Sequence, residues 1–140
     1  MADKQLIEEG LTFIPKFDEN GLITAIAQDA KTSQILMVAY MNREALDLTI
    51  RTGYATYYSR SRKKLWKKGE QSGHMQKVRR ILVDCDQDCI TLKVDVDAGQ
   101  CHVGYDSCFY RALKKGSDKE LEFIAEKTYD PKEAYKNNPK

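Results

Sequence analysis

The segment Ile81-Leu82-Val83-Asp84-Cys85-Asp86-Gln87-Asp88-Cys89-Ile90-Thr91-Leu92-Lys93-Val94 places an acidic, thiol-bearing stretch between two apolar runs. Residues 89–96 alternate apolar and polar side chains, which is the pattern of a half-buried strand. Residues 78–83 form a second β-prone run, so the two runs suit a β-hairpin connected by the acidic stretch. Three carboxylates and two thiols are unusual in such a connection, which makes it a candidate ligand-binding segment.

The pattern on either side of this hairpin predicts a small α+β fold with a mainly antiparallel sheet. Further strands are expected over residues 11–14, 22–27, 35–40, 55–59 and 108–113. A helix is expected from Asn42, its N-cap, to Arg51, with Gly53 just past its end. Residues 117–120, Ser-Asp-Lys-Glu, match a capping box and predict a second helix reaching about Lys127.

The chain has 140 residues, of which 41% are hydrophobic, and a net charge of only +2 at pH 7. This size suffices for one domain with its own core, which we expect over residues 1–128, followed by a polar tail over residues 129–140 that frays. The small net charge indicates no overall attraction to nucleic acid or membranes. No signal peptide or membrane span is recognisable. We therefore expect a cytoplasmic protein with reduced cysteines.

The four cysteines lie at positions 85, 89, 101 and 108, without the C-x-x-C pair of common zinc ribbons and fingers. On an extended strand the Cα atoms of Cys85 and Cys89 would lie ~13 Å apart, whereas zinc needs its sulfurs within ~4 Å of one another. Cys85, Cys101 and Cys108 are therefore the candidate zinc ligands, and Cys89 is expected to be structural. Three protein ligands and one open position are typical of a catalytic zinc. The alternative is that all four thiols are small buried side chains.

Asp84, Asp86 and Asp88 begin like an EF-hand loop, but the required glycine and glutamate at its sixth and twelfth positions are Cys89 and Asp95. A bent D-x-D-x-D segment can still gather oxygen ligands for magnesium, and repulsion among the carboxylates favours a cation or a basic partner. The alternative is a solvated acidic turn. Because sulfur suits zinc and oxygen suits magnesium, the interleaved donors suggest two metals side by side.

Residues 57–73 interleave aromatic and cationic side chains, and residues 60–73 are expected to form a polar loop interrupted by Leu65 and Trp66. Arg60 and Arg62 could fork onto phosphates, and Trp66 could stack on a purine. The candidate substrate-binding residues are Ser59, Arg60, Ser61, Arg62, Trp66, Glu70, Ser72 and Gly73. The alternatives are a solvated basic loop, a platform for single-stranded nucleic acid, a core tryptophan and a surface glutamate.

His102 directly follows Cys101. Neighbouring side chains on a strand point to opposite faces, so the two residues would share a metal only across a turn. Proton transfer near the metal is the other functional interpretation of His102.

Three segments, YYSRSRKKLWKKGEQSGHMQ (57–76), VDCDQDCITLKVD (83–95) and CHVGYDSCFYR (101–111), together resemble the phosphoribosyl-AMP cyclohydrolase family. The resemblance covers roughly residues 21–111 and implies a homodimer of a small α+β pseudo-barrel with a capping helix. It implies active sites at the subunit interface, with a zinc held by Cys85 of one subunit and by Cys101 and Cys108 of the other. It also implies one magnesium per subunit on Asp84, Asp86 and Asp88, and His102 as the proton-transfer residue.

The activity implied by this resemblance is hydrolytic opening of the N1-alkylated adenine ring of 1-(5-phosphoribosyl)-AMP, the third step of histidine biosynthesis. The residues after Arg111 are too few for an appended pyrophosphohydrolase, so a monofunctional enzyme is expected. The rival interpretation is a nucleic-acid-binding module with a structural zinc. A zinc deaminase of nucleosides is disfavoured because the H-x-E…P-C-x-x-C signature is absent.

Overall fold

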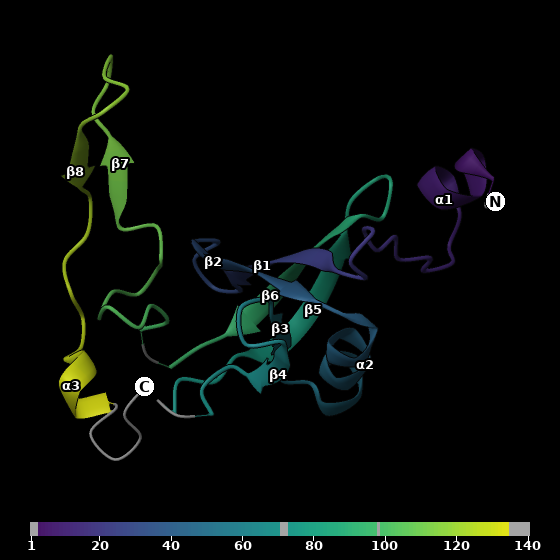
Figure 1. Cartoon of the computed structure of the whole chain (residues 1–140), viewed down its shortest axis with the longest axis horizontal. Helices are drawn as coiled ribbons and strands as arrows, with labels where there is room; N and C mark the ends of the chain where they lie inside the picture. The colour runs from purple at the N-terminus through teal and green to yellow at the C-terminus, as the bar shows by residue number, and fades with distance from the viewer. Residues whose placement is uncertain (1–2, 71–72, 98, 135–140) are drawn as a thin grey trace.

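The structure is a computed structural model that describes residues 3–70, 73–97 and 99–134. Its elements are α1 (Lys4–Glu9), β1 (Ile23–Asp29), β2 (Ile35–Met41), α2 (Arg43–Thr52), β3 (Thr56–Ser59), β4 (Lys64–Lys67), β5 (Lys77–Val83), β6 (Cys89–Asp95), β7 (Arg111–Leu113), β8 (Leu121–Phe123) and α3 (Pro131–Ala134). Figure 1 shows α1 at one end of the molecule, the β7–β8 hairpin at the other and the main sheet between them. None of the described helices has the length and apolar character needed to cross a membrane.

The main sheet has the strand order β2-β1-β6-β5. The outer pairs, β1–β2 and β5–β6, are antiparallel, which confirms the expected hairpin around the acidic stretch. The central pair, β1–β6, is parallel, with Thr24 opposite Cys89 and Asp29 opposite Val94. A parallel pair requires a long crossover, and here α2 and the β3–β4 hairpin lie within it. The small α+β fold with mostly antiparallel strands is therefore confirmed.

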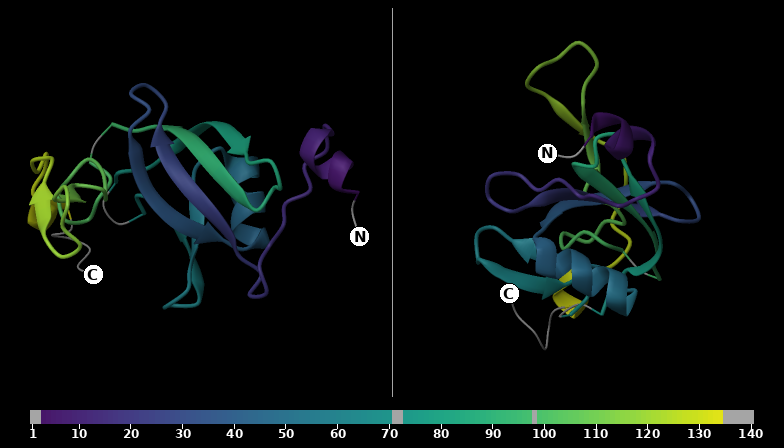
Figure 2. Two further views of the ribbon diagram at one scale, coloured as in Figure 1. Left: turned by 90° about the horizontal axis from the view of Figure 1, so that it is seen from above. Right: turned by 90° about the vertical axis from the view of Figure 1, so that its right-hand side faces the viewer.

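Helix α2 and the β3–β4 hairpin lie on the same face of the main sheet (Figure 2). The helix has both predicted caps: the Asn42 side chain accepts a hydrogen bond from the Ala45 amide at 2.8 Å, and Gly53 ends the helix with a φ of 80°. Its buried face carries Ala45, Leu46 and Thr49. The buried core cluster comprises Ile23, Ala25, Ala27, Leu36, Met37, Met41, Ala45, Leu46, Ala55, Tyr57, Ile90, Leu92 and Val94.

The helix expected after the capping box at residues 117–120 is wrong. The Ser117 hydroxyl does accept hydrogen bonds from the amides of Lys119 and Glu120, at 3.1 and 2.9 Å, as a helix cap would. The chain then turns into β8, which pairs antiparallel with β7. The same side-chain hydrogen bonds thus serve a hairpin turn, because they satisfy two local amides regardless of the structure that the next residues adopt.

Three further expectations also need correction. Residues 11–14 form no strand, because their backbone is bonded to the Gln87 side chain and to no neighbouring strand among the described residues. Residues 60–73 are not loop throughout, because β4 pairs with β3 and places Leu65 and Trp66 against the core. The strand expected from residue 108 begins only at Arg111.

The described residues form one four-stranded and two two-stranded sheets and no closed barrel. The pseudo-barrel with a capping helix therefore stays a prediction. Helix α3 lies within the expected tail, and residues 135–140 lie outside the described part of the chain.

Candidate active site

A pocket of about 440 Å³ lies between the β3–β4 hairpin and residues 99–108, which we call the thiol loop. Its lining residues are Met37, Ser59, Arg62, Lys64, Leu65, Trp66, Lys67, Lys68, Gly69, Glu70, Gln100, His102 and Cys108. The pocket therefore brings together six residues singled out from the sequence: Ser59, Arg62, Trp66, Glu70, His102 and Cys108. It combines cations, an aromatic ring, a histidine and a thiol in one recess.

The thiol loop is anchored on the start of β2. The Cys108 amide donates a hydrogen bond to the Leu36 carbonyl at 2.7 Å, and the Ser107 hydroxyl donates to the Ile35 carbonyl at 2.6 Å. Within the loop, the Cys101 amide donates to the carbonyl of Tyr105 at 3.0 Å. This turn brings the thiols of Cys101, which is buried, and Cys108, which is exposed, into hydrogen-bonding contact.

The electrostatic environment of this thiol pair suits a cation. Although part of the Cys108 residue is exposed at the surface, surrounding atoms desolvate its thiol, and this desolvation and then the neighbouring Cys101 raise its pKa to about 11, while the positive charge of Lys68 acts in the opposite direction. Two adjacent thiols resist double ionisation, and a shared metal ion removes this resistance because it stabilises both thiolates. Sulfur donors fit zinc better than they fit magnesium. The pair therefore fits half of a zinc site.

The third predicted zinc ligand lies at the other end of the sheet. Strand β6 runs for seven residues, about 20 Å, between residues 84–88, which we call the acidic loop, and the segment that leads to the thiol loop. Cys85 lies in the acidic loop and is exposed. Among the described residues of one chain, Cys85 joins no cluster with Cys101 and Cys108. A single copy of the chain therefore does not assemble the three-thiolate set.

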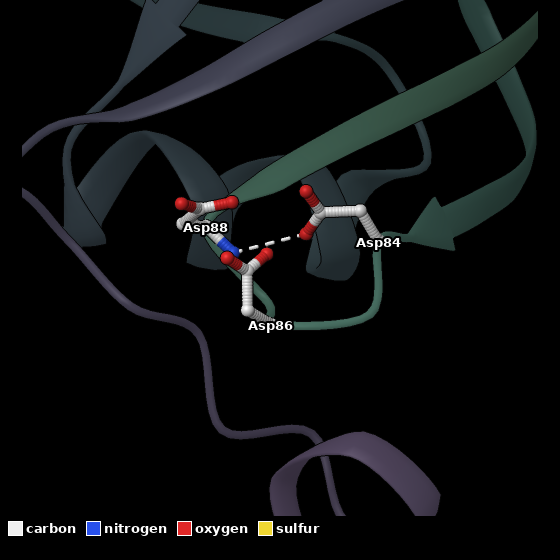
Figure 3. A group of neighbouring side chains, drawn as sticks. All are labelled: Asp84, Asp86 and Asp88. Atoms are coloured by element: carbon white, nitrogen blue, oxygen red, sulfur yellow. Dashed lines mark hydrogen bonds between the residues drawn. The ribbon is translucent and has the colours of Figure 1, made fainter.

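The acidic loop gathers its three carboxylates so that one oxygen of each lies within 4.8 Å of the others (Figure 3). Asp84 shapes the loop, because its side chain accepts hydrogen bonds from the amides of Asp88 and Cys89 at 3.0 and 3.2 Å. Hydrogen bonds with Asp86 and then with Asp84 raise the pKa of Asp88. Exposed oxygen donors at this spacing fit a magnesium ion.

For the half-buried Cys89, burial and then the charge of Asp84 raise the thiol pKa, which fits a structural role.

Gln87, inside the acidic loop, binds the N-terminal segment. It is buried and has a φ of 61°. Its amide oxygen accepts a hydrogen bond from the Ile14 amide at 2.6 Å, and its amide nitrogen donates to the carbonyls of Ile7 and Thr12 at 3.0 and 3.3 Å. The Lys16 amide adds a bond to the Gln87 carbonyl at 2.7 Å. The sequence alone contains no signal for this role.

Three of the predicted substrate-binding residues do not line the pocket, and a fourth cannot be placed among the described residues. The Arg60 guanidinium lies over the Tyr40 ring, 4.1 Å from its centroid, and the Ser61 hydroxyl lies 3.4 Å from that of Ser59. Gly73 lines a second recess of about 480 Å³. Ser72 lies outside the described residues. Local alternation along a loop does not reveal which side chains face a pocket, because the fold of the loop decides it.

Sequence reasoning also missed a buried polar network, two members of which, Lys68 and Gln100, line the pocket. The Tyr57 hydroxyl donates to the Gln76 amide oxygen at 2.6 Å, and the Gln76 amide nitrogen donates to the Gln100 amide oxygen at 3.0 Å. The Lys68 ammonium donates to the Gln100 carbonyl at 2.6 Å. All four residues are buried, and desolvation raises the pKa of Tyr57 far above its ordinary range. Nothing in their sequence neighbourhood predicts that polar side chains are buried here.

Comparison with known proteins identifies the family. The sequence pattern of the family described as phosphoribosyl-AMP cyclohydrolase matches residues 37–110. A protein named phosphoribosyl-AMP cyclohydrolase from Rhodopseudomonas palustris (strain TIE-1) is 56% identical to this chain, and the match covers 92% of this chain and 88% of that protein. A protein of the same name from Methanococcoides burtonii is 58% identical, and the match covers 86% of this chain and 94% of that protein. A protein of the same name from Chlorobium limicola is 50% identical over 96% of this chain and 97% of its own length. The chain therefore belongs to the phosphoribosyl-AMP cyclohydrolase family.

Proposed function

We propose that this chain is a phosphoribosyl-AMP cyclohydrolase, which adds water to C6 of the N1-alkylated adenine of 1-(5-phosphoribosyl)-AMP and breaks the bond between N1 and C6. The product is a formamidine-linked imidazole carboxamide ribonucleotide, formed in the third step of histidine biosynthesis. Membership of the family supports this activity. The observation that carries it is the pocket in which cationic side chains, Trp66, His102 and Cys108 meet.

The hairpin side of this pocket suits a phosphorylated nucleotide. Arg62 and Lys64 place positive charge where a phosphate can be held, and a guanidinium can form two hydrogen bonds to it. The Trp66 ring offers a face to the adenine, and Ser59 offers a hydroxyl. Glu70 repels phosphate, so we assign it to a hydroxyl or amino group of the substrate. Arg60 is left out of this set because its guanidinium lies on Tyr40.

For the zinc, we propose a site shared by two copies of the chain in a homodimer. Cys101 and Cys108 of one copy already lie in contact, and Cys85 of the second copy would complete a set of three thiolates. The separation of Cys85 from the thiol loop by the length of β6 supports this arrangement, because one chain cannot bring the three sulfurs together without unfolding the sheet. One zinc per subunit follows from the twofold symmetry of such a dimer.

The β7–β8 hairpin supports a homodimer as well. It extends away from the main sheet (Figure 1) and carries large exposed apolar side chains, including Leu113, Leu121 and Phe123, which are 58%, 49% and 68% exposed. The Phe123 ring also stacks beside the paired rings of Tyr105 and Tyr110. Exposed apolar clusters of this kind are typical of interaction surfaces. A second copy would cover this cluster.

In the proposed mechanism, zinc when bound supplies Lewis acidity that activates a water for attack on C6. His102 lies on the pocket wall with Cys108 and is placed to move protons between this water and the substrate. Protonation of N1 allows the ring to open after water has added to C6.

The carboxylates of Asp84, Asp86 and Asp88 would hold a magnesium ion, one per subunit, which orients the substrate or orders the interface. We place the enzyme in the cytoplasm, where its four free cysteines stay reduced.

A spectrophotometric assay with phosphoribosyl-AMP tests the proposal. Turnover is expected to disappear after chelation and to return when zinc is added back. The nucleic-acid-binding alternative predicts no turnover and an oligonucleotide affinity that falls steeply with salt. That result would contradict the enzymatic proposal.

A further inference from the structure

Lys68 lines the pocket and is almost fully buried, in contrast to most lysines. It follows β4 directly, is 9% exposed and lines the pocket together with His102 and Cys108. Its ammonium group donates to the Gln100 carbonyl at 2.6 Å. Burying a positive charge costs free energy unless nearby groups stabilise it, so this placement calls for an explanation in the site itself.

Gln100, which binds Lys68, is held by hydrogen bonds to both its backbone and its side chain. The Gln100 carbonyl accepts from Lys68, and the Gln100 side chain accepts from Gln76, which in turn accepts from Tyr57. Gln100 immediately precedes Cys101 in the chain. The network therefore ties the backbone next to Cys101 to the residue that follows the β3–β4 hairpin and to the segment before β5.

Lys68 also brings charge to the thiol pair. Lys68 and Cys108 line the same pocket, so the ammonium group places its positive charge at the thiol end of the site. Three thiolates around a divalent zinc leave one net negative charge, which a nearby ammonium group offsets. Groups that contact metal ligands without contacting the metal commonly orient the ligands and adjust the affinity of the site.

We propose that Lys68 is a positioning residue of the metal site: its buried ammonium group holds the Gln100 carbonyl, and with it the backbone of Cys101, and sets a positive charge beside the two thiols. The inference rests on the proposed zinc site at Cys101 and Cys108. It adds a residue from the hairpin that no ligand pattern in the sequence identifies.

The test uses the full-length protein and three variants, Lys68→Met, Lys68→Arg and Lys63→Met. Lys68→Met removes the hydrogen-bond donor and the positive charge, whereas Lys68→Arg keeps a donor and a positive charge on a guanidinium of different shape. Lys63→Met is the control, because it removes an exposed lysine from the turn of the β3–β4 hairpin, outside the pocket. Zinc affinity is measured by competition with a chelator. Amide hydrogen exchange of residues 99–108 is measured in the zinc-free protein, so that the backbone effect is read without metal.

For Lys68→Met we expect zinc affinity to fall on the order of 10- to 100-fold and exchange in the thiol loop to accelerate. Lys68→Arg should recover part of both, and Lys63→Met should match the wild type. Unchanged zinc affinity in Lys68→Met would overturn the proposal, whether or not exchange accelerates, because the lysine would then serve only the fold. Failure of the wild-type thiols to bind zinc would overturn the metal site itself, and this is read from the wild-type protein before any variant is compared.

Discussion

The candidate metal ligands at the two ends of the main sheet are brought together by different kinds of contact. The acidic loop gathers three carboxylates within five residues, and the side chain that shapes it, that of Asp84, bonds only the next few amides. The thiol loop depends on contacts with Leu36, Lys68 and Gln76, which are distant in the sequence. The acidic loop is thus complete within one chain, whereas the thiol end has two sulfurs and lacks a third. The difference supports the proposal that the thiol site is completed by a second copy of the chain, because its two described sulfurs are brought together by tertiary contacts and Cys85 lies elsewhere.

The largest expected effect tests whether the two ends form one site across a dimer. Cys101→Ala and Cys85→Ala should each lower kcat by at least ~10³-fold, because either change removes a proposed ligand of the metal that would activate water. Mixing the two inactive variants under subunit exchange should restore about one quarter of the wild-type activity, since half of the dimers would carry one intact site of two.

Cys89→Ser is the matched control for these cysteine variants, because Cys89 is half-buried beside the acidic loop but outside the proposed ligand set. It should keep its zinc and most of its activity. If verified subunit exchange restores nothing, or if Cys85→Ala stays active, the two ends are independent sites and the shared zinc is wrong.

His102→Ala sharpens the assignment of roles at the thiol end. We expect kcat to fall on the order of 10²-fold while one zinc per subunit remains, because the proposed role of the imidazole is to move protons and not to bind the metal. Steady-state kinetics and zinc quantification on the same sample measure both effects. Near-normal turnover would remove His102 from proton transfer, and loss of zinc would make it a ligand.

Gln87→Ala tests how much stability the acidic loop gains from its hydrogen bonds to the N-terminal segment. The variant should lower the free energy of unfolding by about 1–3 kcal/mol, because the Ile14 amide and two carbonyls lose their partner. Urea denaturation measures the change. Gln34→Ala, at an exposed position in the β1–β2 turn, is the control and should stay within ~0.5 kcal/mol of the wild type. An equal effect in both variants would show that Gln87 does not anchor the N-terminal segment.

The smallest expected effect distinguishes two neighbouring arginines near the thiol end. Arg62→Ala should raise KM for phosphoribosyl-AMP by about tenfold, because a charge-assisted hydrogen bond to phosphate contributes about 1.5–3 kcal/mol. Arg60→Ala should change KM less than about twofold, since its guanidinium lies on Tyr40. Equal effects in steady-state kinetics would mean that the pocket of the substrate complex extends to Arg60.

Where the sequence predicted structure correctly, the interactions are local. Helix α2 has its caps at Asn42 and Gly53 as expected, and strands β5 and β6 flank the acidic loop as their alternation predicted. The failed prediction at residues 117–127 is instructive, because Ser117 forms the capping hydrogen bonds but the pairing of β8 with β7 makes the next segment a strand. A local motif specifies the bonds of its own turn and no more.

The sequence by itself determined the local elements, the kinds of donor atom available and the resemblance to a family. Only the tertiary structure decided that β1 and β6 pair in parallel, that Arg62 and not Arg60 lines the pocket, and that Lys68, Gln76 and Gln100 are buried in one hydrogen-bonded network. The physical reason is the distance along the sequence between the groups that interact. Turns, caps and alternation depend on groups a few residues apart, whereas burying a polar side chain requires partners that only the packing of distant segments can bring together.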